Sequence, residues 1–181
     1  MGYPGKNHKQ YAKPTRKFEK GRQADEVKLL VTYGLRNKRE IWKSQMVLRR
    51  FRQAARDITA MSTAGTDPKI VEAKKRQMLG HLERMGFLGA DSDIEAILSL
   101  KVEQQLERRL QTVVYRKGLA RSPKQARQFI THGHIMIGTR KVTIPGYHEN
   151  RDEESQVCYA THSPIANEVH PERARISKVG R

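Results

Sequence analysis

The side chains of this sequence that could do chemistry are mainly arginines and lysines, and the chemistry they suggest is the binding of phosphate groups. Arg49, Arg50, Arg52 and Arg56 place four guanidinium groups within eight residues. A planar guanidinium can hold two phosphate oxygens at once, whereas a lysine binds as a point charge. A basic stripe opposite an apolar stripe is often only a solvated face. The density of this one favours contact with the phosphates of a nucleic acid.

The net charge favours the same kind of partner. The chain has 181 residues, and 36 Lys and Arg against 19 Asp and Glu give a formal net charge of +17. The excess lies in two blocks, residues 1–56 with a net charge of +12 and residues 107–147 with +8. Such a charge repels itself unless a polyanion neutralises it, so a basic protein without a polyanionic partner is the weaker interpretation. Two separated blocks predict two contact surfaces on one large polyanion, with nucleic acid as the first candidate.

Side chains that could support catalysis or bind a metal are few. Carboxylates at 91, 93 and 95 could do acid–base work, but at the start of a helix they more often complement its dipole. His132 and His134 flank Gly133 without an obvious third ligand, so we expect them to cap a helix end or to contact nucleic acid. We predict no catalytic residue, no metal and no cofactor.

The hydropathy and the cysteine count bear on the compartment. No apolar run approaches the ~20 residues that a membrane-spanning helix needs. The N-terminus has no apolar stretch after its positive charges, so it does not resemble a secretory signal. Cys158 is the single cysteine, which excludes an internal disulfide and Cys-x-x-Cys zinc sites; we expect it to be packed within a strand. The sequence therefore predicts a cytoplasmic protein without a membrane partner.

The N-terminal elements that carry the first basic block are an arm and two helices. Residues 1–22 show no helical period and predict an extended arm, with Tyr3, Tyr11 and Phe18 as stacking or packing anchors. An ordinary frayed terminus is the alternative. A short helix is expected from Ala24 to Leu35.

The next helix is expected to begin after Asn37 and to run to about Ala60. Glu40, three residues after the N-cap, completes a capping-box pattern. Trp42 lies near the basic face, where it either packs against another segment or stacks on a base. The apolar positions recur at helical spacing and predict a core stripe: Ile41, Leu48, Phe51, Ala55 and Ile58.

A nearly neutral segment follows and is expected to be scaffold. Asp67 is a predicted N-cap with Pro68 at the first helical position, and Gly86 ends that helix. Residues 87–100 are expected to hold a turn and a short helix.

The second basic block predicts two helices and a β-hairpin. One helix is expected over 102–117 and another from Ser122-Pro123 to about His132. The second helix should bury Ala126, Phe129 and Ile130 and turn outward Lys124, Arg127, Gln128 and Thr131. Alternating apolar residues around positions 138–141 predict the hairpin. A further strand is expected at 157–159. The acidic run 149–154 is expected to be a solvated loop, and the tail from about Ala166 is expected to be extended.

Several stretches of the second block match a known RNA-binding module in order. They are Leu106–Leu110, Gly118–Ser122, Ala126–Ile130 and His132–Ile135, followed by the hairpin and Pro145-Gly146-Tyr147. Over about 40 residues the chain therefore resembles the S4 module, which is named after the fourth protein of the small ribosomal subunit.

The rest of the chain resembles the same ribosomal protein family, in its archaeal branch. The matching stretches are Lys13-Pro14, Tyr33–Glu40, Ser163–Ala166 and His170–Arg173. The resemblance implies a structural protein, not an enzyme, that binds small-subunit ribosomal RNA where several helices meet and that helps nucleate assembly. It also implies neighbouring small-subunit proteins, with S5 among them. Many members carry an N-terminal cysteine cluster for zinc, which this chain lacks.

Two other functions stay open. The S4 module is also appended to RNA-modifying enzymes, but we find no nucleotide loop, nucleophile–base pair or metal cluster in the remainder of this chain. An RNA-binding stress or assembly factor with the same module is the other alternative.

The predicted RNA-binding residues combine the resemblance with the outward helix faces. A-form RNA hides its base edges in a deep major groove, so a protein at a junction reads shape through phosphates. Besides the four arginines of the first block, we predict contacts from Arg108, Arg109, Arg116, Arg121, Ser122, Lys124, Arg127, Gln128, His132, Arg140 and Lys141. For each residue alone, a solvated surface position is the alternative.

The expected fold class is α+β. A mostly helical N-terminal body should accompany a small RNA-binding module, in which a helix pair packs on a short β-hairpin sheet. We divide the chain into the arm 1–22, the helical body 23–100, the module 101–162 and an extended tail 163–181.

Overall fold

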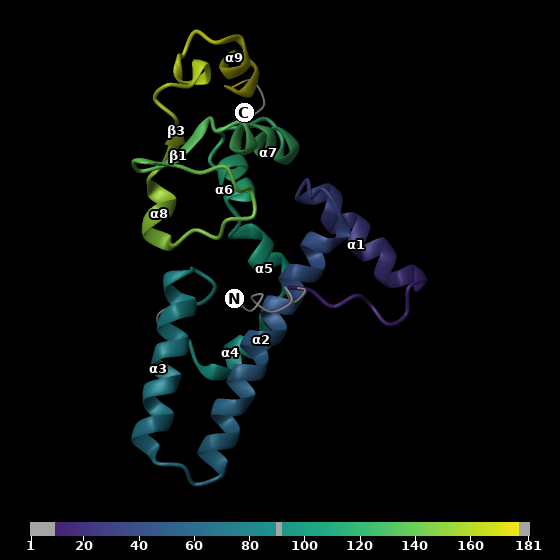
Figure 1. Ribbon diagram of the computed structural model, residues 1–181, viewed down its shortest axis with the longest axis vertical. Helices are drawn as coiled ribbons and strands as arrows, with labels where there is room; N and C mark the ends of the chain where they lie inside the picture. Colours follow the sequence, from purple (N-terminus) through teal and green to yellow (C-terminus); the bar gives the residue numbers. More distant parts are fainter. Residues whose placement is uncertain (1–9, 90–91, 178–181) are drawn as a thin grey trace, which may run out of the picture.

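The computed structural model describes residues 10–89 and 92–177. It combines helices with one small antiparallel sheet, which confirms the predicted α+β class. Figure 1 shows an elongated molecule in which the antiparallel pair α2 and α3 forms one end and the sheet lies near the other. Helices α5 and α6 lie between these two ends (Figure 1).

Helices α1 to α4 form the N-terminal body. Their bounds are Lys20–Thr32, Lys38–Thr63, Pro68–Arg84 and Ile94–Ser99. The stripe predicted for α2 faces inward, because Ile41, Leu48, Ala55 and Ile58 are all buried. Leu82 of α3 and Ile97 of α4 belong to the same apolar cluster as Leu48. Burial of these side chains holds the helices of the body together.

The predicted arm ends earlier than expected, because α1 begins at Lys20 rather than at Ala24. Tyr11 packs near Trp42, with 6.0 Å between the ring centroids. Phe18 is 89% exposed. Tyr3 lies outside the described residues. Tyr11 is thus a packing anchor of the arm, while the Phe18 ring is open to a partner.

Of the N-caps predicted for the helices of the body, one is confirmed and one is wrong. Asp67 caps α3 as predicted, because its side chain accepts a hydrogen bond of 3.0 Å from the Lys69 amide. The capping box predicted at Asn37 is wrong, since Asn37 makes no side-chain cap bond. The Glu40 carboxylate instead binds two arginines from the second half of the chain.

The single helix predicted over 102–117 is wrong. The structure divides it into α5 (Val102–Glu107) and α6 (Leu110–Arg116). At the break, the amides of Leu110 and Gln111 donate to the carbonyls of Tyr147 and Pro145, at 2.8 and 3.3 Å. These distant acceptors replace the ones a continuous helix would supply four residues earlier.

Helix α7 packs on a three-stranded antiparallel sheet of order β2-β1-β3. Their bounds are Pro123–Thr131 for α7, Ile135–Ile137 for β1, Arg140–Lys141 for β2 and Val157–Tyr159 for β3. The predicted hairpin is confirmed: Ile137 pairs with Arg140 across Gly138-Thr139. Gly138 has φ = 56°, a value that glycine adopts without strain.

The acidic run is not the solvated loop that we predicted. Its residues form the short helix α8 (Arg151–Ser155), preceded by the fully buried Glu149. Neither Glu149 carboxylate oxygen has a hydrogen-bond partner among the described residues. Burial raises the pKa of Glu149 to about 7.

Two further C-terminal predictions are wrong. The tail is not extended: it forms the 3-10 turn η1 (Pro164–Ala166) and α9 (Pro171–Ser177) and buries Ile165 and Ile176 in the core of the module. Cys158 is exposed rather than packed. It pairs with Met136 on the sheet face opposite to the one that buries Val157.

Candidate nucleic-acid interface

The outer face of α7 is exposed and basic. The Ser122 hydroxyl caps the helix by accepting a bond of 3.2 Å from the Gln125 amide. The predicted inner residues Ala126, Phe129 and Ile130 are buried, which fixes the rotation of the helix. Along the free face, five side chains are exposed: Arg121, Lys124, Gln128, Thr131 and His132. Arg121 and Lys124 form no ion pair with another described residue, so their charges are available to a ligand.

Strand β2 adds a cation at the C-terminal end of this face. Gly133 follows α7 with φ = 73°, and a Cβ atom built there would lie 2.6 Å from the Lys141 ammonium nitrogen. Glycine therefore leaves the room that Lys141 occupies beside the last turn of α7. The helix dipole favours a cation at that position. We name the exposed side chains Arg121, Lys124, Gln128, His132 and Lys141 the α7 strip.

His134 lies behind this strip and is structural. Its Nδ1 is 2.9 Å from the Ser163 hydroxyl, and its ring contacts Phe129 edge to face. Burial, followed by the neighbouring charges of His132 and Lys141, lowers the pKa of His134. A neutral His134 therefore supports the exposed His132, whose ring stacks on it at 6.1 Å between centroids.

Three other predicted arginines have carboxylate partners within the chain. Arg108 pairs with Glu154 at 2.6 Å and is only 17% exposed. Arg116 pairs with Glu107 at 2.8 Å but stays 63% exposed. The exposed Arg140 pairs with Glu153. Arg116 and Arg140 can reach a ligand by exchanging partners, whereas Arg108 is turned inward.

Arg109 and Arg127 meet at Glu40, which corrects the expectation that both face solvent. Arg109 Nη2 lies 3.1 Å from Glu40 Oε2, and Arg127 Nη2 lies 2.7 Å from Glu40 Oε1. The Arg109 side chain is 7% exposed, that of Arg127 23% and that of Glu40 18%. Burial alone would raise the pKa of Glu40, but the hydrogen bond from Arg127 and the charge of Arg109 hold it below its ordinary value. The three side chains form a partly buried ion cluster that joins α2 to α6 and α7.

The Gln111 side chain adds hydrogen bonds to backbone carbonyls beside this ion cluster. Its amide Nε2 donates to the carbonyls of Tyr33, Gly34 and Pro123 at 2.9 to 3.1 Å. Gly34 has φ = 58°, and a Cβ atom there would lie 2.8 Å from the Pro123 Cβ. The start of α7 is therefore seated against the turn between α1 and α2. These contacts hold the body and the α7 strip in one orientation.

The arginines predicted on α2 are placed differently from one another. Arg49, Arg50 and Arg56 are exposed. Arg52 is half-buried and donates to the Leu100 carbonyl at 2.5 Å, so it ties α2 to the end of α4. Trp42 packs within the protein, and its indole N–H donates to Glu26 at 3.0 Å. The exposed arginines of α2 form a second basic surface, which is distant from the α7 strip in the sequence.

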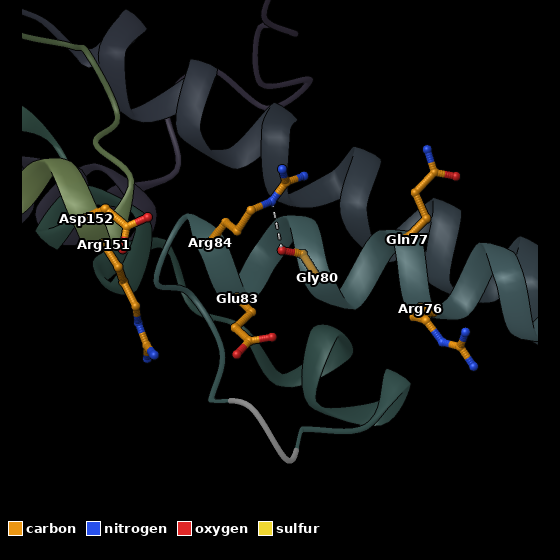
Figure 2. Close-up of a pocket in the computed structure, with 7 residues that line it drawn as sticks. All are labelled: Arg76, Gln77, Gly80, Glu83, Arg84, Arg151 and Asp152. Atoms are coloured by element: carbon orange, nitrogen blue, oxygen red, sulfur yellow. Dashed lines mark hydrogen bonds between the residues drawn. The ribbon is translucent and has the colours of Figure 1, made fainter.

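A third group of cations was missed from the sequence. Arg76 and Arg84 of α3 and Arg151 of α8 line a pocket of about 530 Å³; Figure 2 labels these residues. All three are exposed, although Glu83 and Asp152 also line the pocket. The near-neutral charge of the α3 block and the acidic run around Arg151 concealed this grouping, which depends on the fold.

Within residues 10–89 and 92–177, no three or more His, Cys, Asp or Glu side chains are grouped in a way that could hold a metal ion. None of the described helices is both long and apolar enough to span a bilayer.

The basic module around α7 matches a known protein family. Residues 108–151 match the S4 domain family. Small ribosomal subunit protein uS4 of Methanospirillum hungatei is 57% identical over 181 residues, which is 100% of both chains. The uS4 protein of Methanoregula boonei is 57% identical over 178 residues, 98% of this chain and 96% of the relative. That of Thermoplasma acidophilum is 43% identical over 173 residues, 96% of this chain and 86% of the relative.

Proposed function

The chain belongs to the family of small ribosomal subunit protein uS4, and we propose that it is a structural component of that subunit which binds ribosomal RNA directly. The observation that carries the proposal is the α7 strip. It lies on the S4 domain, exposes cations that have no ion pair among the described residues, and is held at a fixed angle to the rest of the protein. Such a surface suits the phosphate backbone of folded RNA, which is recognised largely by shape.

Two basic surfaces in a fixed relation suit a site where RNA helices converge. The α7 strip meets one backbone and the exposed arginines of α2 meet another. The ion cluster of Glu40, Arg109 and Arg127 sets the angle between the surfaces. A protein that binds two RNA segments at once favours their folded arrangement, since the second contact becomes intramolecular. By this route the protein helps nucleate subunit assembly in the cytoplasm, with S5 among its protein neighbours.

We expect the protein to act as a binding component of the subunit and not as an enzyme. The 57% identity to the uS4 protein of Methanospirillum hungatei extends over all 181 residues, which supports a binding role rather than an enzymatic one. The alternative, an RNA-binding stress or assembly factor, predicts weaker association of the protein with the small ribosomal subunit. A ribosomal component should remain with small subunits during sedimentation in high salt, whereas a factor should wash off.

Filter binding of the full chain to small-subunit ribosomal RNA tests the proposal. Lys124→Glu places a negative charge on the α7 strip and should weaken binding at least about tenfold. Lys69→Glu is the matched control, because Lys69 is an exposed lysine at the far end of α3. Equal effects of the two substitutions, with both proteins folded, would show that only net charge matters and would reject the α7 strip as a contact surface.

A further inference from the structure

A second pocket lies where the N-terminal body meets the module. It measures about 410 Å³, within the usual range for ligand sites of roughly 300 to 1,000 Å³. Its wall is built by Lys43 of α2, Gln105 of α5, Arg127 of α7 and the loop around Ile144 and His148. We name it the seam pocket.

Two residues that line the seam pocket each have a buried polar atom without a hydrogen-bond partner among the described residues. Gln105 is 1% exposed, and its Oε1 accepts no hydrogen bond from them. The buried Nδ1 of His148 is also without a partner there. Burial, together with the charge of Arg109, lowers the pKa of His148 to about 4, so the ring is neutral at pH 7. Leaving such groups unpaired costs free energy, which a ligand with N–H donors would recover.

The charges around the pocket argue against a simple phosphate site. Arg109 and Arg127 both line it, but the Glu40 carboxylate already binds both guanidinium groups. Lys43 is exposed and has no ion pair among the described residues. The positive charge available to a ligand therefore comes mainly from Lys43. The buried unpaired atoms need an N–H group as hydrogen-bond donor, which a phosphate does not possess.

The rim of the pocket adds an apolar surface. Ile144 is 63% exposed and lies beside Pro145 in the same lining. A planar ring could lie against these side chains while its edge reaches inward. An apolar rim, buried acceptors and one free ammonium group together match a nucleotide, which combines a flat base, N–H donors and a phosphate.

We propose that the seam pocket receives one unstacked nucleotide of the bound RNA, whose base donates N–H groups to Gln105 and His148 while its phosphate meets Lys43. Unstacked bases in loops and bulges are the usual carriers of sequence information in RNA. The inference rests on the proposed function, because the nucleotide belongs to the same ribosomal RNA. It adds a base-specific contact to an interface that otherwise reads phosphates.

Base-specific chemical probing of the complex tests the proposal. The full chain is bound to small-subunit ribosomal RNA, and dimethyl sulfate, a glyoxal reagent and a carbodiimide reagent together report which of the four bases are shielded. The variants are Ile144→Ser, at an exposed site, and Gln105→Leu, which removes the unpaired acceptor. Val169→Ser is the control, since Val169 is an 86% exposed aliphatic residue outside the pocket.

We expect one base to be shielded by the unchanged protein and by Val169→Ser, and to become reactive again with both pocket variants. Affinity should fall about five- to tenfold, the size expected for the loss of roughly one base contact. Gln105→Leu should keep or raise the urea midpoint, because it removes an unpaired polar group. If the variants bind the RNA with an unchanged affinity and pattern of shielded bases, the pocket proposal is overturned while the proposed function stands. If the unchanged protein does not bind this RNA, the proposed function is overturned as well.

Discussion

Replacing Glu40 by glutamine should destabilise the folded protein by about 2 to 4 kcal/mol at pH 7. The substitution keeps the size of the side chain but leaves Arg109, which is 7% exposed, without its counter-charge. Breaking a buried ion pair typically costs about 3 to 5 kcal/mol. The Glu40 and Arg127 side chains are 18% and 23% exposed, so water offsets part of that loss and lowers the figure.

Urea unfolding followed by fluorescence measures this effect directly. The chain has one tryptophan, Trp42, and it lies in α2 close to Glu40 in the sequence. Glu72→Gln is the matched control, because Glu72 is an exposed helical glutamate without an ion pair among the described residues. A loss below about 0.5 kcal/mol for Glu40→Gln, similar to an exposed substitution, would refute the role of the ion cluster.

The pH dependence gives the same prediction a second check. The pKa of Glu40 in the folded protein is lowered below its ordinary value of 4.5. Its contribution to stability is therefore complete above pH 4.5 and is lost as the pH falls through the lower folded pKa. The difference in stability between the unchanged protein and Glu40→Gln should shrink in that acid range. A difference that stays constant down to full acid unfolding would contradict the assignment.

Three other predictions concern the module. Ile130→Ala should cost about 2 to 5 kcal/mol of folding free energy in urea unfolding, and RNA binding per folded molecule should be spared. Glu149 has a folded pKa of about 7, above its ordinary 4.5, so stability should fall as the pH rises from 4.5 to 7; Glu149→Gln should remove this dependence and stabilise the protein above that range. A fragment of residues 101–162 loses Ile165 and Ile176 from the core, so in urea it should unfold well before a fragment extended to residue 177.

Features that depend on neighbouring residues could be predicted from the sequence. The Ser122 cap and the buried stripe of α7 follow from a polar cap residue, a proline and helical spacing. The hairpin turn at Gly138-Thr139 follows from alternation around a glycine. The same local patterns correctly place Lys124 and Gln128 on an exposed face.

Features that depend on distant partners could not be predicted. Arg127 occupies an outward position in its own helix, yet its partner Glu40 lies 87 residues earlier in the chain. The capping pattern at Asn37 predicts that Glu40 binds the start of its own helix, but in the structure Glu40 binds distant arginines instead. The break before Leu110 depends on carbonyls of the loop near residue 146, which no pattern within the helix reveals.

Salt titration of RNA binding tests most directly whether the α7 strip holds phosphates. With roughly six to ten phosphate contacts, the affinity of the full chain for small-subunit ribosomal RNA should fall about 10³-fold or more between about 50 and 200 mM salt. Replacing Arg121 and Lys124 together by alanine should reduce the log–log slope by roughly two contacts and leave the urea midpoint nearly unchanged. A slope that the double variant does not alter would contradict phosphate binding by the α7 strip.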